Sequence, residues 1–262
     1  MYIKALLPLL CILSASLSIY AKKDTAKDDS PANLAEWVQQ QKDVLPATVD
    51  GVTVYRPTID NGNAVISGLT DIPDIDKERV FVAMMVYAAD NLDLETERID
   101  NVDYSKKRFV VARNVSEGEG KDAATYTYNS AFQAFDGIMS FLTYEISIGY
   151  REKGIIPRTL AFEKLKPEKN TRHKELIENF SILNSKYLDG MARFVKNADN
   201  ISVSHWDEIK ARKIVKGMNA TEVKLIAGRP RNITESGSRE KWMYNNDFVV
   251  IFTDGIVSNV VQ

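Results

Sequence analysis

The fold class is decided most clearly near the C-terminus, by residues 214–261, which read IVKGMNATEVKLIAGRPRNITESGSREKWMYNNDFVVIFTDGIVSNVV. Asn219 is a favoured N-cap residue, and Glu222 follows three positions later, as in a capping box. Gly228 suits the left-handed position after a helix, and Pro230 cannot continue one. The pattern therefore predicts a short helix between Asn219 and Gly228.

Turn residues divide the rest of this stretch into short strands. Small and polar residues at 236–238, 245–247 and 254–255 predict three turns. With a first helix beginning near His205, the pattern predicts a module of two helices and three antiparallel strands over residues 204–262. The apolar residues of the predicted strands are Trp242 and Tyr244, then Phe248, Val250 and Phe252, then residues 256–261.

An ordered set of residues in this module matches a known pattern: Ile214, Gly217, Met218, Glu222, Val223, Gly228, Pro230, Trp242, Tyr244, Phe252 and Val257. In this order they resemble the BamE/SmpA/OmlA-like envelope family, whose module has the fold of the β-lactamase inhibitor protein. The resemblance covers residues 204–262, under a quarter of the chain. It implies outer-membrane assembly or envelope maintenance through protein contacts. Typical members begin at a lipidated cysteine, and this chain has no usable one.

Residues 52–165 predict a separate α+β domain, with a helix packed on an antiparallel sheet. Asn61-Gly62 is a tight-turn signal between the first two strands, and Asp76 is a plausible N-cap for the helix. The predicted strands cover residues 52–55, 64–69, 98–102, 108–115, 141–150 and 155–165. Through Ser67-Gly68, the helix after Asp76 and the hairpin around Gly154, this part resembles uncharacterised secreted bacterial domains.

A long amphipathic helix is predicted over residues 174–197, between the two units. Its apolar residues recur at steps of three and four, which is typical of a helix with one buried face. Gly190 weakens this helix by about 1 kcal/mol relative to alanine. The apolar positions are Leu176, Ile177, Phe180, Leu183, Tyr187, Met191, Phe194 and Val195.

The first 51 residues have the pattern of an export signal and a leader. Residues 1–21 combine Lys4, an apolar run and a small residue at the end, as a cleaved signal peptide does. Lipidation at Cys11, the single cysteine, is not expected because Leu10 before it is not small. Residues 22–51 are interpreted as a flexible leader with a short helix at 33–44. We expect an exported protein, periplasmic or outer-membrane associated, without a lipid anchor.

Little in the sequence indicates catalysis, a metal or a cofactor, and none of these is expected. His173 is interpreted as solvated at a helix start, and His205 with Glu208 as a solvated helix face rather than a zinc site. Residues 71–76 hold three aspartates that lack the order of a calcium loop. Trp242 and Tyr244 are candidates for partner binding, and packing in the core is the favoured alternative for both.

The charge balance argues against nucleic acid, because the net charge is −2 with no localised basic stripe. No stretch after the signal peptide is apolar enough to cross a membrane. The sequence therefore favours a non-enzymatic envelope protein that acts through protein–protein binding, by an exposed sheet face or edge. Two alternatives stay open: a secreted hydrolase that uses paired carboxylates on glycan or peptide, and a small-ligand carrier. The oligomeric state also stays open.

Overall fold

The computed structural model describes residues 47–49, 52–93, 96–152, 156–198, 201–245 and 247–261. Helices and antiparallel sheets are combined in an α+β fold, which confirms the fold class expected from the sequence. The predicted signal peptide at 1–21, the predicted helix at 33–44 and most of the predicted leader lie outside the described residues. The predicted leader is wrong near its end, where Ala47–Val49 forms a strand, β1.

A seven-stranded antiparallel sheet forms the larger layer, in the order β3-β4-β8-β7-β6-β5 with β9 also paired to β8. Strand β8 is long enough to pair with β4 along its first half and with β9 along its second. The strands are β3 (Thr58–Asp60), β4 (Asn63–Asp71), β5 (Arg98–Asp103), β6 (Arg108–Glu117), β7 (Ala124–Phe135), β8 (Ile138–Glu152) and β9 (Ile156–Ala161).

The sequence predicted only one of the two strands of the central hairpin, β7–β8. The sequence predicts a strand within β8, but no strand where β7 lies. In the structure β7 pairs with both β6 and β8 and buries Tyr126, Tyr128 and Phe132. The predicted strand at 155–165 is also shorter, because β9 ends at Ala161 and a 3₁₀ turn, η2 (Phe162–Lys164), follows.

The Asn61-Gly62 turn is confirmed, but it joins different strands from those predicted. It connects β3 to β4, with Asp60 opposite Asn63. The preceding strand, β2 (Val52–Val54), pairs with β1 instead and lies against the long helix α3. Both turn residues have positive φ, which asparagine and glycine tolerate.

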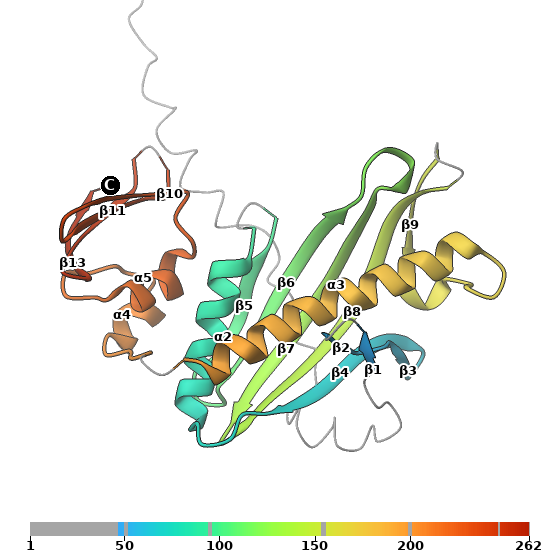
Figure 1. The fold of residues 1–262 in the computed structure, drawn as a ribbon, viewed down its shortest axis with the longest axis horizontal. Helices are drawn as coiled ribbons and strands as arrows, with labels where there is room; N and C mark the ends of the chain where they lie inside the picture. The colour runs from blue at the N-terminus through green and yellow to red at the C-terminus, as the bar shows by residue number, and fades with distance from the viewer. Residues whose placement is uncertain are drawn as a thin grey trace, which may run out of the picture.

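Two helices lie over the same face of the large sheet (Figure 1). Helix α2 (Lys77–Asn91) begins at the predicted N-cap, since the Asp76 side chain accepts from the N–H of Arg79. Helix α3 (Thr171–Lys196) begins three residues before its predicted start, with Asn170 as the N-cap. The predicted apolar stripe of α3 faces the core, where Leu176, Phe180 and Met191 are buried completely.

Gly190 permits the close approach of α3 to α2. A Cβ atom at this position would collide with the hydroxyl of Tyr87 and lie 3.1 Å from its Cζ. The Tyr87 ring in turn packs against Tyr187, with centroids 5.4 Å apart. The helix therefore gives up the propensity of an alanine to admit an aromatic side chain from its neighbour.

A polar layer lies between α3 and the sheet. The hydroxyls of Ser130 and Thr143 are 2.8 Å apart, and the amide of Asn184 donates to the Thr143 oxygen at 3.4 Å. One position further along α3, the Ser185 hydroxyl accepts from the backbone N–H of Tyr55 at 2.9 Å. Apart from Tyr55, these residues are completely buried, so each hydrogen bond replaces one that water would supply.

The C-terminal part is a four-stranded antiparallel sheet with two short helices on one side (Figure 1). Four strands replace the three predicted, because residues 232–236 also form a strand. The capping box at Asn219 and Glu222 is confirmed, with both reciprocal hydrogen bonds present. The elements are α4 (Trp206–Lys210), α5 (Ala220–Ala227), β10 (Asn232–Ser236), β11 (Arg239–Met243), β12 (Val249–Thr253) and β13 (Ile256–Val261).

The two parts of the molecule share an apolar and charged contact. Trp206 packs against both Phe81 and Tyr104, with ring centroids 6.4 and 5.5 Å away, respectively. Lys224 on α5 forms an ion pair with Asp90 on α2 at 2.9 Å.

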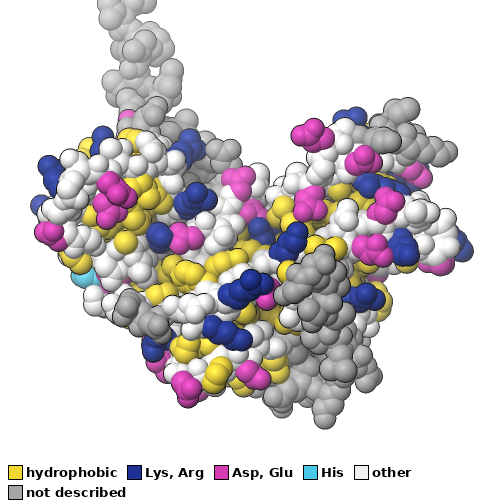
Figure 2. All heavy atoms as spheres, in the orientation of Figure 1, with side chains coloured by type: hydrophobic (Ala, Val, Ile, Leu, Met, Phe, Trp, Pro, Cys, Tyr) yellow, Lys and Arg dark blue, Asp and Glu magenta, His cyan; other side chains and the backbone are white. Residues whose placement is uncertain are grey.

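Figure 2 shows acidic and basic side chains interspersed over the face drawn. Within the described ranges, no helix is both long and apolar enough to cross a bilayer.

Candidate functional site

Trp242 and Tyr244 belong to the interior of the C-terminal part. Trp242 is 4% exposed, and its ring centroid is 4.5 Å from that of Phe252. Tyr244 is half-buried, stacks on Phe248 and donates from its hydroxyl to the Gly228 carbonyl at 3.2 Å. These contacts match the core alternative that the sequence favoured for both residues, so a partner surface must be sought elsewhere.

His173 is not solvated, which corrects the expectation from its charged neighbours. It is 8% exposed, and its Nε2 lies 2.8 Å from the Tyr150 hydroxyl. The backbone N–H of Lys166 donates to Nδ1 at 3.0 Å, so a neutral ring carries its proton on Nε2. His173 therefore fastens the start of α3 to strand β8, which is a structural role.

His205 and Glu222 form a second correction, because His205 faces Glu222 rather than lying on a solvated face with Glu208. Glu222 accepts from the backbone N–H groups of Ser204, His205 and Asn219, and its Oε2 lies 3.0 Å from His205 Nδ1. Burial alone raises the pKa of Glu222, but these donors outweigh it and lower the pKa below its usual value. The carboxylate thus joins the starts of α4 and α5.

A buried ion pair under the helices also serves packing. Arg113 Nε lies 2.7 Å from Glu97 Oε1, and its guanidinium carbon is 4.1 Å from the centre of the Tyr187 ring. Burial raises the pKa of the neighbouring Tyr128 to about 12. For the described residues, no group of three or more His, Cys, Asp or Glu side chains is placed to hold a metal ion.

The outer strand β10 presents an open edge. It pairs with β11 on one side, no described strand pairs with its other side, and all five of its residues are exposed. Gly237-Ser238 is a two-residue turn, so Ser236 and Arg239 on either side of it form a hydrogen-bonded pair. Hydrogen bonding alternates along such a strand, and the backbone groups of Ile233 and Glu235 therefore point away from β11.

The edge also ends a row of apolar side chains. Ile233 lies opposite Trp242, which lies opposite Val250, and Val250 lies opposite Val260. Trp242 and Val250 are buried, whereas Ile233 is 45% exposed. An additional strand beside β10 would continue both the backbone ladder and this row. The sequence signal was present as an Ile-Thr pair before a Ser-Gly turn, but it was not interpreted as a strand.

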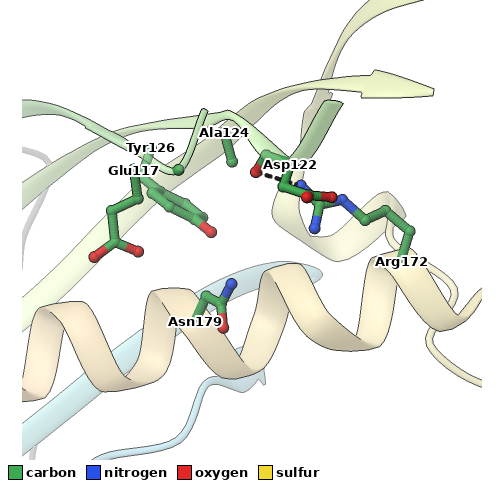
Figure 3. A pocket seen from close by; sticks show the side chains of 7 residues that line it. Glu117, Asp122, Ala124, Tyr126, Arg172 and Asn179 are labelled. Carbon is green, nitrogen blue, oxygen red and sulfur yellow. Dashed lines mark hydrogen bonds between the residues drawn. The ribbon is translucent and has the colours of Figure 1, made fainter. Parts of the chain in front are cut away.

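A polar pocket of about 320 Å³ opens at the other end of the molecule, between the β6–β7 loop and α3. Its floor is the buried pair Ala124 and Tyr126, and Asn179 from α3 stands at the exposed mouth. Figure 3 shows Glu117 and Arg172 on opposite sides of the Tyr126 hydroxyl. These residues come from separate segments of the chain, which explains why the sequence did not single them out.

Gly118 shapes the loop that closes this pocket. Its φ is +72°, and a Cβ atom there would lie 2.8 Å from the carbonyl oxygen of Asp122. That oxygen accepts from Arg172 at 2.7 Å, so the loop is tied to the first turn of α3. The second contact of Arg172 is with the Glu175 carboxylate at 3.3 Å.

Comparison with known proteins finds similarity in structure alone. No protein-family model and no curated protein matches the chain. A TBP-like protein from Parabacteroides distasonis is 16% identical with a TM-score of 0.48, over 54% of this chain and 98% of that one. A DUF4468 family protein from Bacteroides ovatus is 16% identical with a TM-score of 0.42, over 56% and 91%. At these values the likeness supports no conclusion about function.

Proposed function

We propose that this protein is a non-enzymatic, exported envelope protein that binds a partner protein by adding a partner strand to β10. The open edge of β10 is the observation that carries the proposal. Strand addition draws its affinity from main-chain hydrogen bonds and its specificity from alternate side chains. Ile233 supplies the side-chain part, because it leaves an apolar row unfinished at the edge.

The cellular setting of the proposal rests on the sequence. The signal-like residues 1–21 support export, and the ordered residues of 204–262 support a role like that of the BamE/SmpA/OmlA-like family in outer-membrane assembly or maintenance. Fractionation of cells that express the full chain tests this part separately. Recovery of the protein in the cytoplasm with residues 1–21 intact would contradict export and leave the binding mode to be judged by itself.

Site-specific crosslinking tests the binding mode, with a photo-reactive residue at position 233 or at position 256 in the full chain. Ile256 is a matched control because it is 43% exposed and lies on the opposite outer strand of the same sheet. We expect one defined partner to be captured from position 233, and mass spectrometry identifies its crosslinked segment. A synthetic peptide of that segment should then bind the purified protein.

Charge substitutions complete the test. Ile233→Lys places a charge on the open edge, as natural edge strands do to discourage pairing, and should abolish peptide binding. Ile256→Lys should leave binding unchanged. Equal loss in both variants, or crosslinks at 233 only to a second copy of this chain, would contradict binding of a different protein through β10.

A further inference from the structure

The pocket beside α3 has features that a partner strand at β10 does not use. It is lined by the end of β6, the β6–β7 loop, the start of β7 and the first turns of α3. Tyr126 at its floor is completely buried, whereas Asn179 at its mouth is exposed. The volume of about 320 Å³ is at the small end of the usual range for ligand pockets, which suits a molecule of a few polar groups.

The hydroxyl of Tyr126 is the first indication of a ligand. It is buried and has no hydrogen-bond partner of normal geometry. Burial raises the pKa of Tyr126 to about 12, while a side-chain hydrogen bond with Asn179, outside normal geometry, lowers it by less. The hydroxyl thus stays protonated at neutral pH, and no hydrogen bond of normal geometry engages it. A buried hydroxyl without a well-formed hydrogen bond is destabilising, and a bound acceptor would remove this cost.

The charges around this hydroxyl are the second indication. Arg172 and Glu117 stand on opposite sides of it (Figure 3), and both act on the pKa of Tyr126, Glu117 raising it and Arg172 lowering it. Arg172 makes contacts with the Asp122 carbonyl and the Glu175 carboxylate, which leave other guanidinium N–H groups for a ligand. The pocket therefore has Arg172 and neutral donors on one side of the hydroxyl and the Glu117 carboxylate on the other. The Asp122 carboxylate also lines the pocket on the Arg172 side, where it offsets part of the guanidinium charge.

We propose that this pocket binds a small zwitterion, an amino acid or dipeptide. Its carboxylate accepts hydrogen bonds from Arg172, Tyr126 and Asn179, and its ammonium group contacts Glu117. A planar guanidinium is well suited to a carboxylate because it donates two parallel hydrogen bonds. The site lies on the large sheet and is separate from the β10 edge, so its occupancy does not depend on the proposed partner.

Titration calorimetry of the full chain with alanine and with the dipeptide Ala-Ala tests the proposal. Tyr126→Phe keeps the ring and removes the hydroxyl, and should weaken binding about 3- to 10-fold. Tyr128→Phe is the matched control, because the Tyr128 hydroxyl is also buried without a hydrogen bond of normal geometry but does not line the pocket. It should leave the affinity unchanged. Binding of alanine alone or of Ala-Ala alone identifies which of the two zwitterions the pocket takes.

Capped ligands separate the two charges. Blocking the amine in N-acetyl-Ala-Ala should weaken binding to the wild type, and Glu117→Gln should then cause no further loss for that ligand. Blocking both ends should abolish binding. The proposal is overturned if neither zwitterion binds at millimolar concentration, if the doubly capped peptide binds as well as Ala-Ala, or if Tyr128→Phe weakens binding as much as Tyr126→Phe. Circular dichroism shows that each variant is folded.

Discussion

Glu222 has two roles, of which the sequence indicated one. The capping-box pattern predicted its contact with Asn219, which is local. Its contacts with Ser204 and His205 come from residues 17 and 18 positions earlier in the chain, and no local pattern reports them. The expectation that His173 is solvated is wrong for the same reason. It rested on the charged residues next to His173 in the sequence, whereas Tyr150, 23 residues earlier, contacts its ring in the structure.

We expect acid to weaken the C-terminal part through Glu222. Its pKa is lowered in the folded protein, so the stabilisation is present above the unfolded pKa and is lost as the pH falls through the folded pKa. Glu222→Gln should lower the free energy of unfolding by about 1.5–3 kcal/mol near pH 7, with a smaller difference at pH 3. Urea unfolding at both pH values measures this.

Glu235→Gln is the control for this substitution, since Glu235 is exposed on β10. It should change the free energy of unfolding little at either pH. The assignment fails if Glu222→Gln has the same small effect as the control, or if its effect grows as the pH falls.

Gly190→Ala should destabilise the protein, although alanine is the better helix former. The helix gain is about 1 kcal/mol, but the added methyl group meets the Tyr87 hydroxyl. We expect a net loss in urea unfolding. Tyr87→Phe removes the colliding oxygen, so Gly190→Ala should cost less in that background than in the wild type. An equal cost in the two backgrounds would show that the hydroxyl is not the obstacle.

Helices with a clear local pattern were predicted well, as were the outer strands β5 and β13, whereas strands β7 and β10 were not predicted. Helices α2, α3 and α5 have caps and apolar periodicity within their own residues. Strand β7 has alternating aromatic residues between two turn signals, the Gly-rich residues 116–122 and Asp136-Gly137, so its pattern was present in the sequence but was missed. Most of β10 is polar because it is an edge strand. The open edge belongs to β10, a strand that the sequence did not predict. The sequence could therefore suggest that a partner strand binds a sheet edge, but it could not show which strand forms that edge.

Gly118→Ala should loosen the β6–β7 loop. The variant combines an unfavourable positive φ with a close contact to the Asp122 carbonyl, and should cost about 1–2 kcal/mol or more in thermal unfolding. Gly120→Ala is the matched control, because Gly120 also has positive φ but nothing lies within 4 Å of its Cβ position. If the two variants are equally destabilised, the contact with Asp122 adds nothing to the backbone strain.

The sequence predicted two units and a connecting helix. In the structure, Trp206 and Leu225 of the C-terminal part pack against the core of the large sheet. Aromatic contacts of this kind join segments more than 100 residues apart, as in the packing of Trp206 on Phe81. Sequence periodicity describes each unit separately, so it could not foresee the contact between them.

Trp206→Ala should therefore affect both parts. The substitution removes the contacts of the Trp206 ring with Phe81 and Tyr104, and should lower the free energy of unfolding by about 2–4 kcal/mol. This is somewhat less than for a fully buried tryptophan, because Trp206 is half-buried. Hydrogen exchange should show faster exchange in both α2 and α5. Acceleration confined to residues after 206 would mean that the contact stabilises only the C-terminal part.

The polar layer beneath α3 determines where that helix rests. An apolar stripe alone would fit the sheet nearly as well if the helix slid by one turn, about 5.4 Å, because its side chains repeat at that interval. Asn184 and Ser185 remove this ambiguity. A slide would separate them from Thr143 and Tyr55 and leave their polar atoms dry, at about 1–3 kcal/mol for each lost partner. The polar layer therefore favours one position of α3 along the sheet, the one in which both hydrogen bonds form.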